Sequence, residues 1–510
     1  MSTQEFEMVA KTFQGLEDVL AEELRGLGAK NVEPGRRMVS FEGTLSTLYK
    51  ANMCCRTALR ILKPIYKFTA ADPDSLYEMI KEYDWSSVLS LDKTFAIDTV
   101  SNSEEFTHSR YVTYRVKDGI VDWFKDRFGP DSRPRVRLQD ADVMINVHIA
   151  GERVTVSLDS SGESLHKRGY RVAQTEAPIN EVLAAGIILK SGWRGDCPLV
   201  DPMCGSGIFL IEAALIAAGI NPGVYRRHFA FESWPDFDAD LFDEIYNDDS
   251  SERSFDYKIY GGDISPKAVA IATENIKSAG VGKYIDLKVK ALSQWDEAPA
   301  DGVLITNPPY GERISADDMD GLYAMLGSKL KHVFKGYHAW IIGYHEEYFR
   351  KIGLSPSTRE PLYNGSLECE LREYIIFDGD YKSFRQSGGK IHNGDKQPQK
   401  SDKTMRRTSD ARWREEARRN GFGGKKGGDS RQHKEGRFAG KGDWRKDRRF
   451  ADNAEAETPS ENPLARRRNE HALKMLVGKA PSLPASDEPM MRPRRGWKKG
   501  PGLPPESDEK

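Results

Sequence analysis

The sequence predicts an α/β protein whose largest domain, residues 165–380, contains a doubly wound, Rossmann-like parallel sheet. Three observations support this fold class. Apolar strand-like runs alternate with segments of helical periodicity, glycine turns follow strands, and polar residues stand where strands end. Open sheets of this kind bind ligands beyond the carboxyl ends of their strands. We therefore expect the functional residues in the turns that follow the strands.

The first of these turns is rich in glycine. Leu199 and Val200 form a short predicted strand, and a helix with apolar residues at helical spacing begins at Ile208. Gly205 and Gly207 allow a positive φ and a close approach of a ligand to the backbone. The turn is not a phosphate-binding P-loop, because no Gly-Lys-Ser/Thr follows. It is also a poor dinucleotide fingerprint, because Leu210 stands at the third glycine position. The connecting residues are Asp201-Pro202-Met203-Cys204-Gly205-Ser206-Gly207.

The second strand, predicted over Tyr257 to Tyr260, leads into Gly261-Gly262-Asp263. A helix is predicted from Pro266 through Ala279, with Ser265 as its N-cap and Gly280 as the glycine that ends it. The Asp263 carboxylate stands where ribose hydroxyls are bound in related sheets. Residues 229–234 are rich in aromatic side chains, and with the acidic stretch after them they lengthen the connection. We interpret this part as an insertion.

The fourth strand, predicted over Gly302 to Ile305, ends in a turn suited to a flat base with an exocyclic amine. The turn and its continuation read Asn307-Pro308-Pro309-Tyr310-Gly311-Glu312-Arg313. The proline nitrogens carry no hydrogen, so carbonyls in the turn are free to accept hydrogen bonds. The Asn307 amide adds an acceptor, and Tyr310 adds a face for stacking.

These three motifs, in this order, resemble the THUMP-domain class I RNA methyltransferases, and the RlmL type in particular. That type methylates guanine N2 in large-subunit ribosomal RNA and includes proteins once described as adenine-specific DNA methylases. The resemblance extends over about residues 1–380. It includes the linker from Ser157 to Arg171, the helix start Ala177-Pro178-Ile179-Asn180-Glu181, and the N-terminal run from Gly15 to Leu24.

The resemblance implies S-adenosylmethionine as cofactor and no metal. The cofactor would lie over the glycine turn, with its ribose at Asp263, and the turn after the fourth strand would be catalytic. The implied cofactor-binding residues are Asp201, Pro202, Cys204, Gly205, Gly207 and Asp263, and the implied catalytic residues are Asn307, Pro308, Pro309 and Tyr310. One departure concerns the third strand, Asp286 to Lys290. Relatives often carry an acid after it, but here Ala291-Leu292 follows, so backbone groups or Asp296 would meet the adenine amine.

The N-terminal part alternates strand-like and helical patterns, which by themselves indicate only an α+β region. The resemblance divides it into a ferredoxin-like module, residues 1–43, and a THUMP RNA-binding domain, residues 44–158. Within the THUMP domain the patterns predict strands over 95–100, 143–149 and 154–158 and a helix over 114–128. The basic residues Arg110, Arg115, Lys117 and Lys125 are candidate RNA contacts, and a solvated helix face is an equal alternative.

Length and composition limit the number of domains and the cellular compartment that we expect. A length of 510 residues allows three domains. The five cysteines show no Cys-x-x-Cys pairing, which argues against a zinc site or a disulfide framework and suits the cytoplasm. Cys204 is expected in its turn for its small size and not as a nucleophile. No apolar run approaches the ~18 residues of a membrane span, and no signal peptide is visible, so no membrane association is expected.

Charge is divided sharply along the chain. Residues 381–510 contain 33 Lys and Arg against 19 Asp and Glu, a net charge of +14, which leaves −16 for the rest and −2 for the whole chain. Apolar residues are too sparse in this tail to form a core, apart from a short helical pattern near 470–477. We predict a disordered basic tail that contacts RNA, and a passive solubilising extension is the alternative.

The predicted function is therefore methylation of an exocyclic base amine in 23S ribosomal RNA or its large-subunit precursor, by a monomer. Two alternatives remain. Because the turn at Asn307 handles an amine and not a particular base, a DNA adenine-N6 methyltransferase is one. A non-catalytic RNA-binding factor in ribosome assembly is the other, although both sets of ligand motifs are intact.

Overall fold

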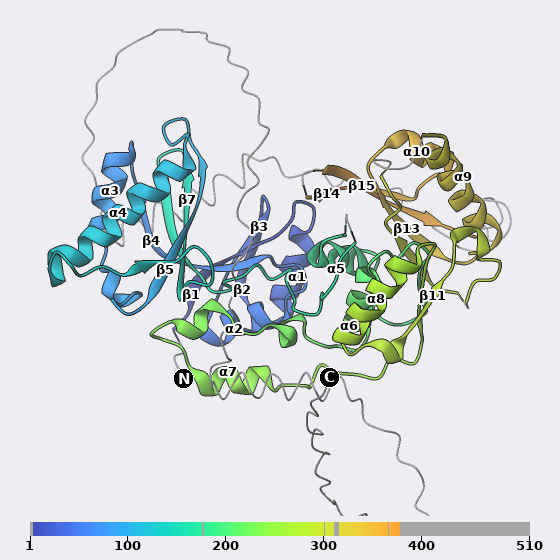
Figure 1. Ribbon diagram of the computed structural model, residues 1–510, viewed down its shortest axis with the longest axis horizontal. Helices are drawn as coiled ribbons and strands as arrows, with labels where there is room; N and C mark the ends of the chain where they lie inside the picture. The colour runs from blue at the N-terminus through green and yellow to red at the C-terminus, as the bar shows by residue number, and fades with distance from the viewer. Residues whose placement is uncertain (1–3, 176–177, 300, 311–315, 366, 378–510) are drawn as a thin grey trace, which may run out of the picture.

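A computed structural model of the chain describes residues 4–175, 178–299, 301–310, 316–365 and 367–377. Two sheets organise the molecule. Figure 1 shows the N-terminal sheet on the left and the C-terminal sheet on the right, with α1 and α5 between them. The predicted tail, including the helical pattern near 470–477, lies outside the described residues.

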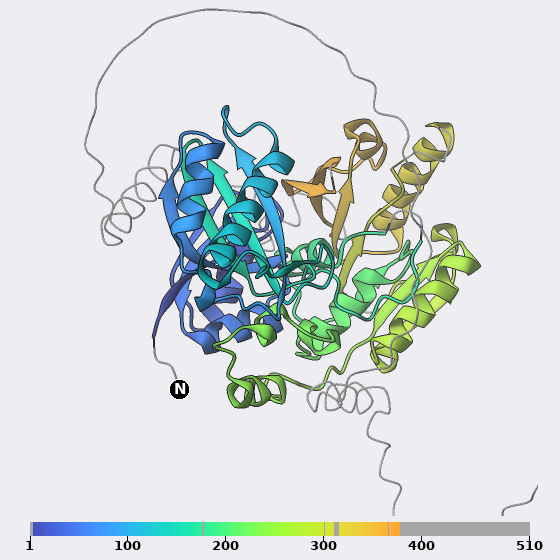
Figure 2. The same ribbon diagram turned by 60° about the vertical axis from the view of Figure 1, so that its left-hand side comes forward.

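The N-terminal sheet has eight strands in the order β2-β3-β1-β4-β8-β7-β5-β6. Helices α3 and α4 pack together on one of its faces and lie in front of its strands in Figure 2. The strands are β1 (Phe6–Lys11), β2 (Lys30–Gly35), β3 (Met38–Gly43), β4 (Arg60–Thr69), β5 (Thr94–Asn102), β6 (Arg135–Val136), β7 (Val143–Ala150) and β8 (Arg153–Asp159). The helices are α1 (Glu17–Gly26), α2 (Leu45–Cys54), α3 (Pro73–Glu82), η1 (Trp85–Ser87) and α4 (Ser109–Phe128).

Strand β4 joins the two N-terminal parts into one sheet. It pairs with β1 on one side, with Val9 opposite Leu62, and with β8 on the other, with Phe68 opposite Val154. Helix α2, which begins two residues after β3 ends, packs on β3 and β4. Elements from both sides of the predicted boundary at residues 43 and 44 therefore share one core. The division of this region at that point remains a prediction from the sequence.

The C-terminal sheet has seven strands in the order β11-β10-β9-β12-β13-β15-β14, which confirms the predicted doubly wound fold. Its neighbours run parallel from β11 to β13, and β15 is antiparallel to β13 and β14. The strands are β9 (Leu199–Asp201), β10 (Ile259–Asp263), β11 (Ile285–Val289), β12 (Val303–Thr306), β13 (His338–Gly343), β14 (Thr358–Asn364) and β15 (Leu367–Ile375). Its helices are α5 (Glu181–Lys190), α6 (Ile208–Ala217), α7 (Ala239–Tyr246), α8 (Pro266–Ser278), α9 (Ala316–His332) and α10 (Glu346–Lys351), with 3-10 turns η2 (Pro222–Tyr225), η3 (Ala230–Ser233), η4 (Gly282–Tyr284) and η5 (Leu292–Gln294).

Two cores cover the two faces of this sheet. Helices α5, α6 and α8 pack on one face, where Leu199 and Ile305 are buried, and α9 and α10 pack on the other, where Val200 and Leu304 are buried. The burial of both faces explains why these strands are apolar throughout and do not alternate. Strand β10 extends three residues beyond its predicted end. Gly261 lies inside the strand and must be a glycine, because a Cβ there would lie 2.4 Å from Cδ1 of Leu210 on α6.

A buried polar network attaches the N-terminal half to the C-terminal sheet. Glu212 of α6 is fully buried and accepts a hydrogen bond from the Tyr170 hydroxyl at 2.8 Å, with Arg168 Nε at 3.5 Å. Arg168 in turn donates to the carbonyl oxygen of Arg56, and Arg56 donates to that of Ile220 at 2.7 Å. The linker is therefore held to both halves by charge-assisted hydrogen bonds.

This network predicts that Glu212→Ala will destabilise the protein strongly. The change leaves the hydroxyl of Tyr170 and the guanidinium of Arg168 buried without their acceptor, which typically costs about 3–5 kcal/mol for a buried pair. Thermal unfolding should show a midpoint lowered by several degrees. Glu22→Ala is the control, because Glu22 pairs with Arg25 on the surface, where such pairs contribute ~0–1 kcal/mol. Equal midpoints for the two variants would contradict this account of the network.

Candidate cofactor and base site

The glycine turn after β9 is held in place by strand ends on both sides. The Asp201 carboxylate is buried, and its Oδ1 accepts hydrogen bonds from the Met203 amide at 3.2 Å and the Thr306 hydroxyl at 2.8 Å. Thr306 is the last residue of β12. One carboxylate oxygen therefore ties the start of the glycine turn to the strand that carries the Asn-Pro-Pro-Tyr turn.

Burial makes the carboxyl group of Asp201 a much weaker acid than usual. Loss of solvation raises the pKa of its carboxyl to about 7, and the nearby charge of Asp263 adds to this, while the bonds from Thr306 and Met203 act in the opposite direction. The thiol of Cys204 beside it is buried too, and burial raises its pKa well above the ordinary range. Cys204 thus stays protonated at neutral pH, which fits the expectation that it is not a nucleophile.

The second strand end supports the glycine turn from the other side. Asp263 Oδ2 accepts a bond from the Gly205 amide at 3.0 Å, and its Oδ1 accepts one from the Ser265 amide at 2.8 Å. The Cys204 amide donates to the Gly262 carbonyl oxygen at 2.9 Å. Each carboxylate oxygen of Asp263 keeps a lone pair that could accept a hydroxyl hydrogen bond. Asp263 is therefore both a support of the turn and a candidate ligand.

The two glycines of the turn have different surroundings. Both have a positive φ, +53° at Gly205 and +81° at Gly207, as their turn requires. A Cβ on Gly207 would lie 3.0 Å from the Cβ of Ala272 on α8, so packing between helices explains that glycine. A Cβ on Gly205 would meet no atom of the described residues within 4 Å. Gly205 therefore faces the open space in which a ligand could lie.

The predicted Asn-Pro-Pro-Tyr turn follows β12 at the same sheet edge. Asn307 Oδ1 is buried and accepts no hydrogen bond within the described residues. Pro308 is buried and Pro309 is exposed. A buried acceptor without a donor is costly, so this oxygen is a candidate to accept a hydrogen bond from a ligand. The continuation Gly311-Glu312-Arg313 lies outside the described residues.

Tyr310 is half-buried, and its hydroxyl is held by the hairpin of β14 and β15. Asn364 Nδ2 donates to the Tyr310 hydroxyl oxygen at 3.3 Å, and the Cys369 sulfur lies 3.8 Å from the same oxygen. Burial, with a smaller effect of Cys369, raises the pKa of the Tyr310 hydroxyl, so it is neutral at physiological pH. The hairpin thus sets the orientation of the ring.

The structure adds residues that sequence reasoning missed. Ile264, which follows Asp263, is 75% exposed beside the glycine turn, so its apolar surface is available to the flat face of a ring. Asn275 of α8 is buried; it donates to the Ser206 carbonyl oxygen at 3.1 Å and accepts from the amides of Val172 and Ala173. The only sequence feature that could have identified Ile264 as a site residue is its position directly after Asp263 at a strand end. Asn275 left none, because its partners are far away in the sequence.

Four candidate contacts predicted from the sequence already form ion pairs within the protein. The Asp296 carboxylate lies 3.2 Å from Nζ of Lys329 on α9 and is exposed to solvent, so backbone groups near Ala291 are the better candidate to meet an adenine amine. In the THUMP-like region Arg115 pairs with Asp74, Lys117 with Asp118 and Lys125 with Asp122. Arg110 is exposed. The four basic residues remain predictions as RNA contacts.

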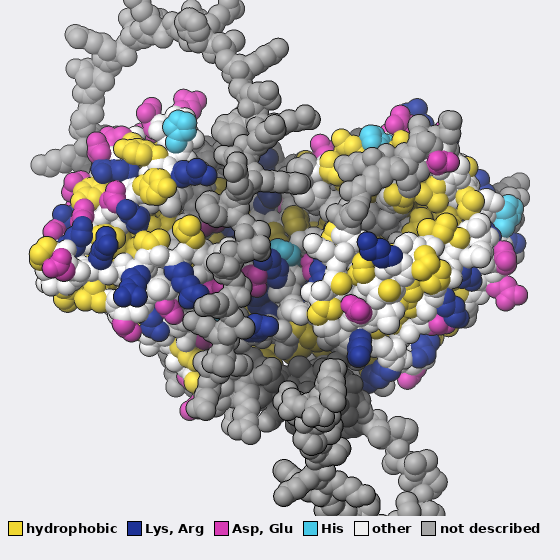
Figure 3. Space-filling view, in the orientation of Figure 1, with side chains coloured by type: hydrophobic (Ala, Val, Ile, Leu, Met, Phe, Trp, Pro, Cys, Tyr) yellow, Lys and Arg dark blue, Asp and Glu magenta, His cyan; other side chains and the backbone are white. Residues whose placement is uncertain are grey.

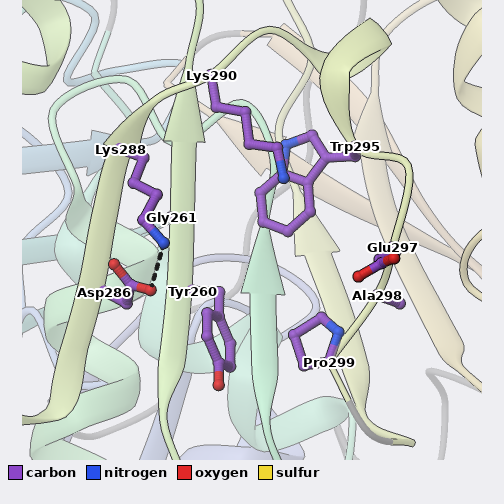
Figure 4. A pocket seen from close by; sticks show the side chains of 9 residues that line it. All are labelled: Tyr260, Gly261, Asp286, Lys288, Lys290, Trp295, Glu297, Ala298 and Pro299. Carbon is purple, nitrogen blue, oxygen red and sulfur yellow. Dashed lines mark hydrogen bonds and ion pairs between the residues drawn. The ribbon is translucent and has the colours of Figure 1, made fainter.

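A pocket of about 250 Å³ lies elsewhere, on the α9 face of β10 and β11 (Figure 4). Tyr260, Trp295 and Lys288 line it, and Lys288 Nζ lies 2.9 Å from a carboxylate oxygen of Asp286. Its lining includes none of the predicted site residues. The glycines and acceptors of the predicted site converge instead at the sheet edge after β9, β10 and β12.

Two absences apply to the described part of the chain. No group of three or more His, Cys, Asp and Glu side chains there is placed to hold a metal ion. None of the helices in those residues combines the length and the apolar character that crossing a bilayer requires. In the space-filling view of Figure 3, Lys and Arg are interspersed with Asp and Glu on the side of the N-terminal sheet.

Three family models match the chain in order. Residues 7–62 match the RlmL ferredoxin-like domain, residues 70–159 the THUMP domain, and residues 168–373 the RMKL-like methyltransferase domain. These matches confirm the predicted sequence of modules. The first model extends through residue 62, beyond the boundary predicted at residue 43.

Curated relatives and solved structures agree with these matches. The chain is 39% identical over 377 residues to a ribosomal RNA large subunit methyltransferase K/L of Syntrophotalea carbinolica, covering 71% of this chain but only 52% of that protein. It is 36% identical to the "Putative RNA methyltransferase slr0064" of Synechocystis, covering 72% of this chain and 96% of that one. A crystal structure of SMU.472, "a putative methyltransferase complexed with SAH", is similar with a TM-score of 0.67 at 33% identity, covering 74% of this chain and all of that chain. The chain thus spans about half the length of the K/L relatives.

The raised pKa of Asp201 predicts that the effect of Asp201→Asn on stability depends on pH. Because the folded pKa of about 7 exceeds the unfolded value of about 3.9, the folded state binds more protons between these values, and stability falls as pH rises through that window. Asparagine carries no charge at either pH. The unfolding midpoint of the variant relative to wild type should therefore increase from pH 5 to pH 8. A difference that stays constant over this range would contradict the buried charge at Asp201.

Proposed function

Because this chain belongs to the THUMP-domain class I methyltransferases of the RlmL type, we propose that it methylates an exocyclic base amine in large-subunit ribosomal RNA, with guanine N2 as the target. One observation carries the proposal. The glycine turn and the Asn-Pro-Pro-Tyr turn meet at one sheet edge and are joined by the hydrogen bond from Thr306 to Asp201. A methyl donor and an amine would therefore be held side by side.

S-adenosylmethionine fits the residues of the glycine turn, and when bound it supplies the methyl group. Asp201, Pro202 and Cys204 shape the turn, and Gly205 leaves space above it. Gly207 lets α6 start directly after the turn, and Asp263 keeps acceptors for ribose hydroxyls. Ile264 offers an apolar surface for the adenine ring. The adenine amine would meet backbone groups near Ala291, since Asp296 pairs with Lys329.

The second turn would orient the amine. The lone pair of an exocyclic amine is shared with the ring, which makes the nitrogen a poor nucleophile. Asn307 Oδ1 and the Pro308 carbonyl oxygen would accept its two N–H bonds and favour a pyramidal nitrogen, and Pro309 would stiffen the turn. Tyr310 would stack on the base, which must leave its own stack to reach the site. Orientation is the main source of acceleration, and the proton becomes acidic once the nitrogen is alkylated.

The alternatives differ in what supports them. An amine-binding turn serves adenine N6 as well as guanine N2, so the choice of guanine rests on the likeness to the RlmL type. The match to a THUMP domain favours RNA over DNA as substrate. Intact acceptors and glycines argue against a non-catalytic assembly factor. The monomeric state, the cytoplasmic location and the RNA-binding role of the tail, which lies outside the described residues, remain predictions.

The experiment that tests the proposal uses ribosomal RNA from a strain that lacks this gene. The purified full-length protein is incubated with that RNA and labelled S-adenosylmethionine, and the modified nucleosides are mapped by mass spectrometry. A labelled N2-methylguanosine at one position of the large-subunit RNA is expected. Label in N6-methyladenosine would support the alternative base, and absence of label from every RNA and DNA substrate would contradict the proposed activity.

The orphaned acceptor predicts that Asn307→Ala will slow methyl transfer far more than it weakens cofactor binding. Loss of one preorganised hydrogen bond typically costs ~10²-fold or more in rate. Single-turnover rates should fall by about that factor, while the affinity for S-adenosylhomocysteine, measured by calorimetry, should change little. Asn247→Ala, at an exposed residue after α7, is the control. A rate near that of wild type would exclude the proposed role of Asn307.

A further inference from the structure

Tyr344 is an exposed aromatic side chain at the edge of the sheet where the two turns meet. It directly follows Gly343, the last residue of β13, and 42% of its surface is exposed. Strands β12 and β13 are parallel neighbours, with Thr306 opposite Ile341, so the residues after them emerge together. We propose that Tyr344 forms the second face of the target-base pocket, opposite Tyr310. This inference rests on the proposed function and adds a substrate-binding residue to it.

The spacing of the two rings supports a base between them. The ring centroids of Tyr310 and Tyr344 are 6.5 Å apart, and the ring planes are inclined by 44°. A flat base between two rings needs two contact layers of about 3.5 Å each, or about 7 Å in total. The observed separation is close to this value, and a rotation of one ring would make the faces parallel.

The two rings differ in their freedom to rotate. The hydroxyl of Tyr310 is held by Asn364, and its partly buried ring packs against the core. The Tyr344 hydroxyl makes no hydrogen bond to the described residues, and its ring is in edge contact with His345, with centroids 4.3 Å apart. His345 in turn contacts Tyr348 edge-on at 5.3 Å. Tyr310 is thus the fixed side of the proposed base pocket, and Tyr344 is the side whose ring rotates to stack on the base.

The orphaned acceptor lies at the same edge. Asn307 Oδ1 is buried without a partner, three residues before Tyr310 in the same turn. A base that donates its amine to Asn307 would lie at the sheet edge from which Tyr310 and Tyr344 both emerge. A single exposed tyrosine would need no explanation. An exposed tyrosine beside a fixed ring and an unpartnered acceptor indicates a place for a flat, amine-bearing ligand.

Stacking does not depend on which base is held, because every base has a π-face. Tyr344 therefore contributes to holding the base out of its stack, and the choice between guanine and adenine lies with the acceptors. Its effect belongs to the step after RNA docking. Overall RNA affinity comes mainly from contacts to phosphates and is expected to change little.

The test compares Tyr344→Ala, Tyr344→Phe and Tyr344→Trp in the full-length protein. Single-turnover methylation of ribosomal RNA from the deletion strain should fall by about 10- to 100-fold in Tyr344→Ala, from the usual effect of removing one stacking ring. Tyr344→Phe and Tyr344→Trp should stay within about threefold of wild type, because the ring and not the hydroxyl acts. Affinities for that RNA and for S-adenosylhomocysteine should be unchanged in all three.

Tyr257→Ala is the matched control. Tyr257 is 45% exposed but precedes β10 at the opposite edge of the sheet, so its variant should methylate at the wild-type rate. A readout independent of methylation is photocrosslinking to a large-subunit RNA transcript that contains 6-thioguanosine. Crosslinked peptides should include Tyr344 and not Tyr257.

Several results would overturn the inference. Wild-type rates in Tyr344→Ala would do so, as would an equal loss in Tyr344→Phe, or a parallel loss of S-adenosylhomocysteine affinity that points to a structural role. If the wild-type enzyme is active and Tyr344→Ala methylates at the same rate, this inference alone is contradicted. An inactive wild-type enzyme would contradict the proposed function, and this inference would fail with it.

Discussion

The buried carboxylate of Asp201 is the constraint on which the site depends. Its Oδ1 receives hydrogen bonds from the glycine turn, through Met203, and from the last residue of β12, Thr306. Burial disfavours the charged form of this group and raises its pKa to about 7. The result is that two turns more than a hundred residues apart in sequence have a fixed relative position. Asp263, at the end of β10, supports the glycine turn from the other side by accepting a hydrogen bond from the Gly205 amide.

The N-terminal half contributes to this arrangement through packing. A Cβ on Gly186 of α5 would lie 2.6 Å from a methyl carbon of Leu16, and one on Gly15 would lie 2.8 Å from a methyl carbon of Leu362 on β14. Lys190 of α5 pairs with Glu360 on the same strand. The hairpin that holds Tyr310 is therefore in contact with the ferredoxin-like module. Together with the network around Glu212, this contact makes the distance between the N-terminal module and the proposed base pocket a property of the packed core.

Local signals in the sequence predicted much of this. Ser265, Pro266 and Gly280 marked the limits of α8 because capping depends on neighbouring residues, and the structure confirms the Ser265 cap and a positive φ at Gly280. The end of β10 was predicted too early. Gly261 was predicted to be part of a turn, but it is needed inside the strand because Leu210 of α6 packs against it. Asn364, Asn275 and Tyr344 were not identified at all. Their roles arise from contacts between distant segments, and a polar or aromatic residue near a strand end has no local pattern that distinguishes it.

Hydrogen exchange with and without S-adenosylhomocysteine tests the central claim most directly, because it locates the cofactor without requiring the RNA. The amides of residues 203–207 and 263–265 should become strongly protected when the ligand saturates the protein, and the hairpin of β7 and β8 should not change. Protection confined to the pocket around Lys288 and Trp295, or no protection in the glycine turn, would contradict the assignment of the cofactor to the sheet edge that Asp201 and Asp263 organise.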